Sequence, residues 1–286
     1  MLPLVMSLAL LSGGLTAAST PQSTSAVADL RALETSYHGR IGVYAIDTAT
    51  GRTIAYRSGE RFPLASTFKG VLAAAVLDKK PDILGKRILI KKKDLLPNSP
   101  ETEKHVGSRM TVAALARAAV TKSDNAAANL LLKQVGGPKG LTRYFRGLND
   151  HVSRLDRTEP GLNDWTPKDP RDTTTPAAIA RDLKALTVGT ALDAGDRRIF
   201  TGWLVANETG DKRIRAGLPK SWRIGDKTGT GSTYGSANDY AIIWPKGSTK
   251  PIIMAIYTNR TAKNGTADET VIAKAATIAA RGLGKL

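Results

Sequence analysis

The chain has 286 residues, and 41% of them are hydrophobic, which is enough to bury a sizeable core in one or two domains. Cysteine is absent, which excludes disulfides, thiol nucleophiles and thiolate metal sites, and the three histidines match no common zinc spacing. The formal net charge of +17 favours contact with anionic surfaces, but no nucleic-acid motif accompanies the longest basic run, Lys91-Lys92-Lys93. We interpret that run as solvated surface, and we expect neither a metal nor a specific nucleic-acid partner.

Residues 1–18 contain no charged side chain and are rich in Leu, Ala and Gly. This composition is typical of a secretory signal peptide, and Ala17, Ala18 and Ser19 supply small residues for cleavage near its end. The segment is too short and too interrupted by glycine to favour a membrane span. We therefore expect a periplasmic or secreted mature protein without a membrane span. A buried first helix is the alternative interpretation.

The next part of the chain predicts a helix over 25–37 and a hairpin formed by strands 40–47 and 52–57. Apolar residues at helical spacing then follow Ser66, which places this serine in the first turn of a largely buried helix. Lys69 lies one turn along on the same face. A helix N-terminus favours negative charge, so a hydroxyl with an amine beside it could form an activated nucleophile. A serine and a lysine three residues apart are common in helices, so this pair taken alone is better explained without a catalytic role.

A polar joint is predicted between two apolar helices in the middle of the chain. Thr111 can cap a helix that runs through residue 120, and another helix over 126–135 ends at Gly136-Gly137-Pro138. Ser123-Asp124-Asn125 lies between them. These residues are favoured as helix caps, but rigid helices on both sides would also present a hydroxyl and an amide to a cleft.

Residues 154–172 have neither a helical nor a strand period and contain three prolines. A loop of this length inside a compact domain is usually functional or disordered. It carries Glu159 and Asn163, and a solvated loop carboxylate is the alternative interpretation for Glu159. We expect two apolar side chains and one ion pair to anchor the loop: Leu162, Trp165, Arg157 and Asp172.

The last part of the chain returns to strands. Helices are predicted over 175–187 and 194–206, strands over 222–227, 239–244 and 251–258, and a final helix from Thr266 or Asp268 to about residue 281. We therefore predict a two-lobed α/β plus all-α fold, in which an antiparallel sheet from both chain ends is flanked by the terminal helices. The sheet domain would comprise 24–61 and 208–286, and the inserted helical domain 62–207, including the 154–172 loop. A cleft at the junction of the lobes is the expected site.

A third motif, Lys227-Thr228-Gly229-Thr230, is predicted at a strand end, where a charge and hydroxyls suit a carboxylate. Ser66-x-x-Lys69, Ser123-Asp124-Asn125 and Lys227-Thr228-Gly229 occur in an order and spacing that resemble the penicillin-recognising serine enzymes. The segment Glu159-x-x-Leu162-Asn163 narrows the resemblance to class A serine β-lactamases. The resemblance extends from about residue 26 to the C-terminus, and it implies the β-lactamase/transpeptidase-like fold.

The resemblance also implies roles for these residues. Ser66 would attack the lactam carbonyl, with Lys69 beside it and Ser123 passing a proton to the lactam nitrogen. Glu159 and Asn163 would hold the water that hydrolyses the acyl-enzyme. Main-chain N–H groups of Ser66 and Thr230 would form the oxyanion hole. The substrate would be bound by Asn125, Lys227, Thr228, Gly229, Thr230 and Arg213. No cofactor is implied, and we expect a monomer.

Some positions depart from the family pattern. Many relatives carry an arginine where this chain has Ser236, and Arg213 lies where other members carry a substituting arginine. Asn98 occupies a position that is often aromatic. The predicted function is hydrolysis of penicillins and cephalosporins. The alternatives are a D-Ala-D-Ala peptidase or penicillin-binding protein, a β-lactam sensor domain and, more remotely, a basic surface-binding protein.

Overall fold

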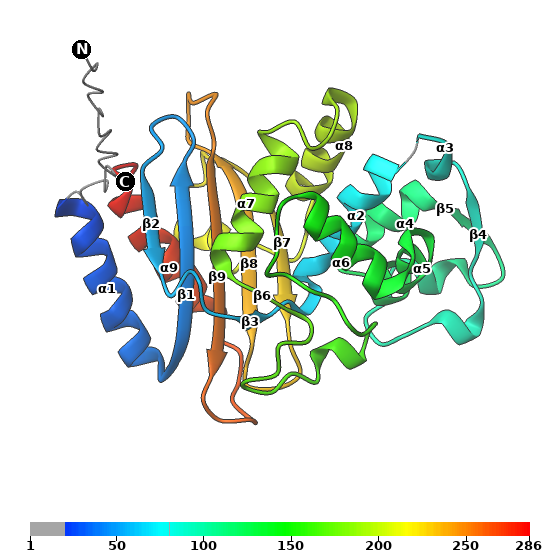
Figure 1. The fold of residues 1–286 in the computed structure, drawn as a ribbon, viewed down its shortest axis with the longest axis horizontal. Coiled ribbons are helices and arrows are strands. Elements are labelled where there is room, and N and C mark those ends of the chain that lie inside the picture. Colours follow the sequence, from blue (N-terminus) through cyan, green and yellow to red (C-terminus); the bar gives the residue numbers. More distant parts are fainter. Residues whose placement is uncertain (1–20, 80) are drawn as a thin grey trace, which may run out of the picture.

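The computed structural model describes residues 21–79 and 81–286. The signal peptide predicted over residues 1–18 lies outside the described residues. The described chain forms a sheet lobe and a helical lobe that lie side by side (Figure 1). This arrangement agrees with the fold class expected from the order of the strands and helices.

The sheet lobe joins the two ends of the chain. Within the described residues its strands follow the order β2-β1-β9-β8-β7, and every neighbouring pair is antiparallel. The central pairing of β1 with β9 runs from Gly39 opposite Arg260 to Asp47 opposite Ile252. The strands are β1 (Gly39–Asp47), β2 (Thr53–Tyr56), β7 (Arg223–Thr230), β8 (Ala237–Trp244) and β9 (Ile252–Arg260).

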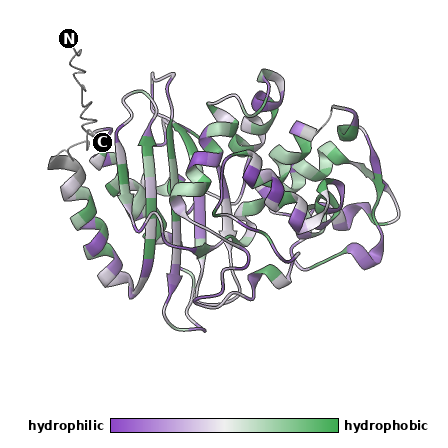
Figure 2. Ribbon diagram, in the orientation of Figure 1, coloured by the Kyte–Doolittle hydropathy of each residue, from purple (hydrophilic) through white to green (hydrophobic). Residues whose placement is uncertain are grey.

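Alternating side chains along the strands build a core on each face of the sheet. On β1, Ile41 and Val43 join the core under the terminal helices α1 (Pro21–Tyr37) and α9 (Glu269–Gly282), whereas Ile46 packs on the opposite face. Figure 2 shows hydrophobic residues along the central strands. The opposite face is covered by α7 (Pro176–Thr187) and by the helical lobe.

The helical lobe packs around α2, which is buried along most of its length. Its close approach to the sheet requires Gly70, because a Cβ there would lie 1.9 Å from the Tyr240 hydroxyl. The helices and strands of this lobe are α2 (Phe68–Lys79), α3 (Pro81–Leu84), β4 (Arg87–Leu89), β5 (Arg109–Thr111), α4 (Val112–Thr121), α5 (Asn125–Val135), α6 (Gly137–Gly147) and α8 (Ala194–Val205).

Three local predictions differ from the structure. Gly136 ends α5 in a left-handed conformation as expected, but Pro138 then starts the unpredicted helix α6, because proline fits the first turn of a helix. Ser66 lies in a 3-10 turn that leads into α2 rather than in the α-helix itself. Strand β7 continues to Thr230 rather than ending at Lys227, so the motif Lys227-Thr228-Gly229-Thr230 forms the last residues of this edge strand, at the strand end where it was predicted.

Candidate active site

Ser66 lies in the 3-10 turn η1 (Ala65–Thr67), which is held against the sheet. The Tyr240 hydroxyl donates to the Thr67 carbonyl at 3.1 Å. Strand β7 passes on the other side, and a Cβ on Gly229 would lie 3.0 Å from the Thr67 nitrogen and 3.1 Å from the Ser66 nitrogen. Any larger residue at position 229 would therefore crowd the main chain of Ser66 and Thr67, which favours glycine where β7 approaches the serine.

The Lys69 ammonium is buried and surrounded by acceptors. Its Nζ lies 2.8 Å from the Ser66 Oγ and 2.9 Å from the Ser123 carbonyl oxygen, and it also donates to Asn125 Oδ1. Burial lowers the pKa of Lys69, and the nearby Glu159 carboxylate opposes that effect. A lysine with a lowered pKa beside a serine hydroxyl is suited to accept its proton.

The joint between α4 and α5 presents Ser123 to the same space. Asp124 caps α5 by accepting from the Ala127 nitrogen at 2.8 Å. Ser123 itself has a φ of 55°, a left-handed conformation that is uncommon outside glycine and concentrated at functional sites. The Asn98 side chain donates to the Ser123 carbonyl at 3.0 Å and helps to hold this conformation. The joint is therefore both a helix cap, as one interpretation held, and part of the cleft.

Lys227 approaches Ser123 from β7. Its Nζ donates to the Ser123 Oγ at 3.2 Å and to the Thr228 carbonyl at 2.8 Å. Burial, with the Lys69 ammonium as the second cause, lowers the pKa of Lys227 to about 7. Near neutral pH Lys227 can therefore occur both as an ammonium, which can donate to the Ser123 hydroxyl, and as a neutral amine.

Glu159 reaches the serine from the 154–172 loop. Its Oε1 lies 3.1 Å from the Lys69 Nζ and 3.4 Å from the Ser66 Oγ, and its Oε2 accepts from the Asn163 side chain at 2.7 Å. The Asn129 side chain fixes the Glu159 main chain, accepting from its nitrogen at 3.0 Å and donating to its carbonyl at 2.8 Å. Hydrogen bonds thus hold both the main chain and the side-chain carboxylate of Glu159 in place.

The loop that carries Glu159 is anchored by the residues that the sequence suggested. Arg157 Nε lies 2.6 Å from Asp172 Oδ2 and closes the neck of the loop. Leu162 is fully buried and Trp165 is almost so. The alternative of a solvated Glu159 carboxylate is wrong, because the side chain of Glu159 is fully buried and its loop is anchored on both sides.

Arg213 lies at the other end of the cleft, almost completely buried. Its guanidinium donates to the carbonyls of Gly229 and Asn238, each at 2.8 Å, and to Thr230 Oγ1 at 2.6 Å. Its Nε lies 3.1 Å from the Glu269 carboxylate. The Ser236 hydroxyl donates to the Thr233 carbonyl at 3.1 Å.

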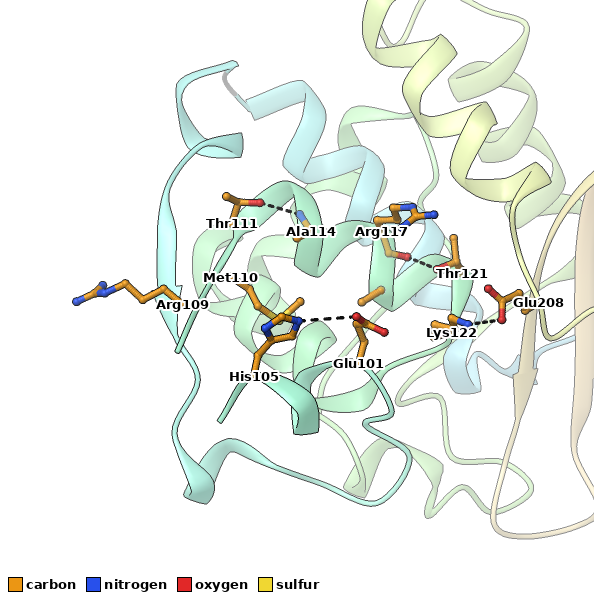
Figure 3. A pocket seen from close by; sticks show the side chains of 11 residues that line it. Glu101, His105, Arg109, Met110, Thr111, Ala114, Arg117, Thr121, Lys122 and Glu208 are labelled. Atoms are coloured by element: carbon orange, nitrogen blue, oxygen red, sulfur yellow. Dashed lines mark hydrogen bonds and ion pairs between the residues drawn. The ribbon is translucent and has the colours of Figure 1, made fainter. Parts of the chain in front are cut away.

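Most of these side chains line one cavity of about 400 Å³ between the lobes. Its lining residues are Ser66, Asn98, Ser123, Asn125, Glu159, Asn163, Thr209, Arg213, Thr228, Gly229, Thr230 and Glu269. A second cavity of about 320 Å³ lies beside α4 (Figure 3). There Lys122 pairs with Glu208 and His105 lies 3.8 Å from Glu101, without a serine beside a lysine, so the cavity between the lobes is the candidate site.

Three residues around the site were not singled out from the sequence. Asn129 lies four residues after Asn125 on α5, so helical spacing could have placed it on the same face. Thr209, which is hydrogen-bonded to Thr228 Oγ1 at 2.5 Å, and Glu269 come from segments far along the chain. No sequence pattern connects those two with the cleft.

Comparison with known proteins identifies the family. The model of a family described as "Beta-lactamase enzyme family" matches residues 25–283. The chain belongs to the beta-lactamase enzyme family. The lactamase is similar to the "Carbapenem-hydrolyzing beta-lactamase KPC" of Klebsiella oxytoca, with 51% identity over 255 residues, or 88% of this chain and 87% of the relative.

Further relatives support the same assignment. "Beta-lactamase AST-1" of Nocardia asteroides is 48% identical over 267 residues, covering 92% of the lactamase and 86% of the relative. The crystal structure of a beta-lactamase from Streptosporangium roseum matches with a TM-score of 0.90 and 60% identity, covering 92% of this chain and 100% of that one. The predicted family, fold class and activity are confirmed, and the protein is a serine β-lactamase that hydrolyses β-lactam amides and thereby confers resistance. In the described part of the chain, every helix is too short or too polar to span a bilayer.

Proposed function

We propose that the lactamase is a class A enzyme acting through a Ser66 acyl-enzyme that Glu159-activated water hydrolyses. The observation that carries this proposal is the placement of one buried carboxylate within 3.4 Å of the Ser66 Oγ and 3.1 Å of the Lys69 Nζ. A nucleophile needs a base within hydrogen-bond reach, and here two candidate bases meet at the serine.

In acylation, the Ser66 oxygen attacks the lactam carbonyl carbon, and the serine proton passes to Lys69 or Glu159. The geometry suits both bases, and which of them acts first in this enzyme class is a recognised dispute. The amide C–N bond then breaks, and Ser123 delivers a proton to the departing nitrogen. Lys227, at 3.2 Å from the Ser123 Oγ, can replace that proton.

Substrate binding is assigned to the opposite wall of the cavity. Main-chain N–H groups of Ser66 and Thr230 would stabilise the oxyanion. Because Gly229 has no side chain, β7 can pass close to the Ser66 nitrogen without covering it. Asn125 would bind the acylamide side chain of the lactam. The ring carboxylate would be bound by Lys227, Thr228, Thr230 and Arg213.

In deacylation, a water held by Glu159 and Asn163 attacks the ester carbonyl. Glu159 accepts a proton from this water. As the ester bond to the Ser66 oxygen breaks, that oxygen takes up the proton again, directly from Glu159 or through Lys69, whose Nζ lies 2.8 Å from the Ser66 Oγ. The Asn163 side chain already donates to Glu159 Oε2 at 2.7 Å, which orients the carboxylate for this step. No step in this sequence requires a group from outside the chain other than substrate and water.

The substrates and setting are also part of the proposal. We assign penicillins and cephalosporins as substrates, while two relatives are named for hydrolysing carbapenems or imipenem. A signal peptide over residues 1–18 would export the enzyme to the periplasm or the medium, where it would act as a monomer. The sheet domain would comprise 24–61 and 208–286, with 62–207 as the inserted domain.

The test compares wild type with Ser66→Ala. We expect sustained turnover of a chromogenic cephalosporin by wild type, whereas a penicillin-binding protein or a sensor domain would give one burst and stop. Ser66→Ala should retain its thermal unfolding profile but lose both turnover and covalent labelling by penicillin. A penicilloyl mass on the Ser66→Ala protein would overturn the assignment of the nucleophile.

A further inference from the structure

A small β-ribbon forms the end of the helical lobe remote from the sheet (Figure 1). Strands β4 and β5 pair with Leu89 opposite Arg109, and the pairing continues where Ile90 donates to the Ser108 carbonyl at 2.9 Å. Ile90 and Met110 point inward and are buried. The side chains of Arg87, Leu89, Lys91 and Arg109 are exposed on the outer face.

Cations dominate this outer face. We define the basic tip as the exposed residues Arg87, Leu89, Lys91, Lys92, Lys93, Val106 and Arg109. Within the described residues, none of its five cationic side chains forms an ion pair. The nearest acid in the sequence, Asp94, pairs with Lys133 at 3.7 Å. Figure 3 shows the Arg109 side chain pointing away from the cavity beside α4. The five cations of the basic tip are therefore exposed and, in the part of the chain that the structure describes, without an ion pair.

Two apolar side chains accompany these charges. Leu89 is 36% exposed between Arg87 and Lys91, and Val106 is 41% exposed on the partner segment. Residues 79–111 contain no Phe, Tyr or Trp on which a nucleobase could stack, and His105 carries the one aromatic ring among them. Cations that surround an exposed leucine match an interface where anionic headgroups border acyl chains better than they match a soluble polyanion.

We propose that the basic tip docks the enzyme on an anionic phospholipid bilayer. Its cations would face lipid phosphates, while Leu89 and Val106 would enter the headgroup boundary. None of its residues lines the cavity that holds Ser66, so docking leaves the reaction machinery untouched. The run Lys91-Lys92-Lys93, which the sequence alone suggested to be solvated surface, would then be part of an interaction surface. It does not depend on the mechanism proposed for Ser66 and Glu159.

The experiment is sedimentation of the purified protein with phosphatidylglycerol vesicles and with phosphatidylcholine vesicles. Each Lys or Arg near an anionic surface contributes about fivefold to partitioning, so Lys91→Gln/Lys92→Gln/Lys93→Gln should lower it roughly a hundredfold. The matched control removes three exposed lysines of the sheet lobe, Lys220→Gln/Lys250→Gln/Lys274→Gln, and should stay within a few-fold of wild type. Both triple variants should hydrolyse a chromogenic cephalosporin at the wild-type rate.

Leu89→Ser separates the lipid surface from a soluble polyanion. This variant should partition several-fold more weakly than wild type, and unlike the loss from removing charge, this loss should persist at about 0.5 M salt. Three outcomes would overturn the proposal: no binding to phosphatidylglycerol vesicles, an equal loss in both triple variants, or binding to soluble polyphosphate that competes fully and is indifferent to Leu89.

Discussion

Substitution of Arg213 by alanine should separate substrate recognition from structure. A hydrogen bond to a charged group contributes about 1.5–3 kcal/mol, so loss of the guanidinium should lower kcat/KM about 10- to 150-fold for substrates that bear the ring carboxylate. The same side chain also donates to the buried carbonyls of Gly229 and Asn238. Each carbonyl left without a donor costs about 1–3 kcal/mol, so the thermal midpoint should fall as well.

The assay therefore needs two substrates and one control variant. Steady-state kinetics with a β-lactam that lacks the ring carboxylate measures the structural effect alone, and that substrate should lose much less. Arg213→Lys keeps a charge with fewer directed donors, and it should recover part of the carboxylate-dependent loss. An equal loss for both substrates would refute the assignment of Arg213 to carboxylate binding.

The remaining predictions concern pH. Burial, with the Asp150 carboxylate as the second cause, raises the pKa of Asp182 well above its usual range. The folded state therefore favours the protonated acid. The free energy of unfolding should fall as the pH rises from the unfolded-state pKa of Asp182 toward its folded-state pKa. Asp182→Asn should therefore raise the melting temperature more at about pH 8 than at about pH 4, and an identical gain at both would contradict this. Burial lowers the pKa of Lys227 to about 7, so kcat/KM for carboxylate-bearing substrates should decline above about pH 7 as the ammonium loses its proton. A kcat/KM that does not change with pH would show that the Lys227 charge does not contribute to substrate binding.

Much of the fold followed from the sequence because local chemistry and tertiary packing agree. Strand periodicity at both chain ends predicted the sheet, and Thr111 accepts from the Ala114 nitrogen as the cap that it was expected to be. Helix α6 was missed because Gly136-Gly137-Pro138 resembles a terminus, although Pro138 also suits the start of a helix. The same residues thus end one helix and begin another.

Only the site residues that belong to short sequence motifs could be predicted from the sequence. Ser66 and Lys69 are neighbours through helical spacing, but their approach to Glu159 depends on a loop whose course no local pattern fixes. The Glu269 contact with Arg213 joins the start of α9 to the cleft and depends wholly on how the lobes pack. Residues of this kind become visible only when the fold is known.

Glu159→Gln tests the central mechanism most directly. The amide is isosteric and can hold water, but it cannot accept a proton, and a general base contributes about 10²–10⁴-fold. Mass spectrometry during single turnover of penicillin should show no accumulated adduct on wild type and a persistent penicilloyl mass on Ser66 of the variant. Turnover should stop near one equivalent. A variant that turns over like wild type without an adduct would contradict the proposed hydrolysis by Glu159-activated water.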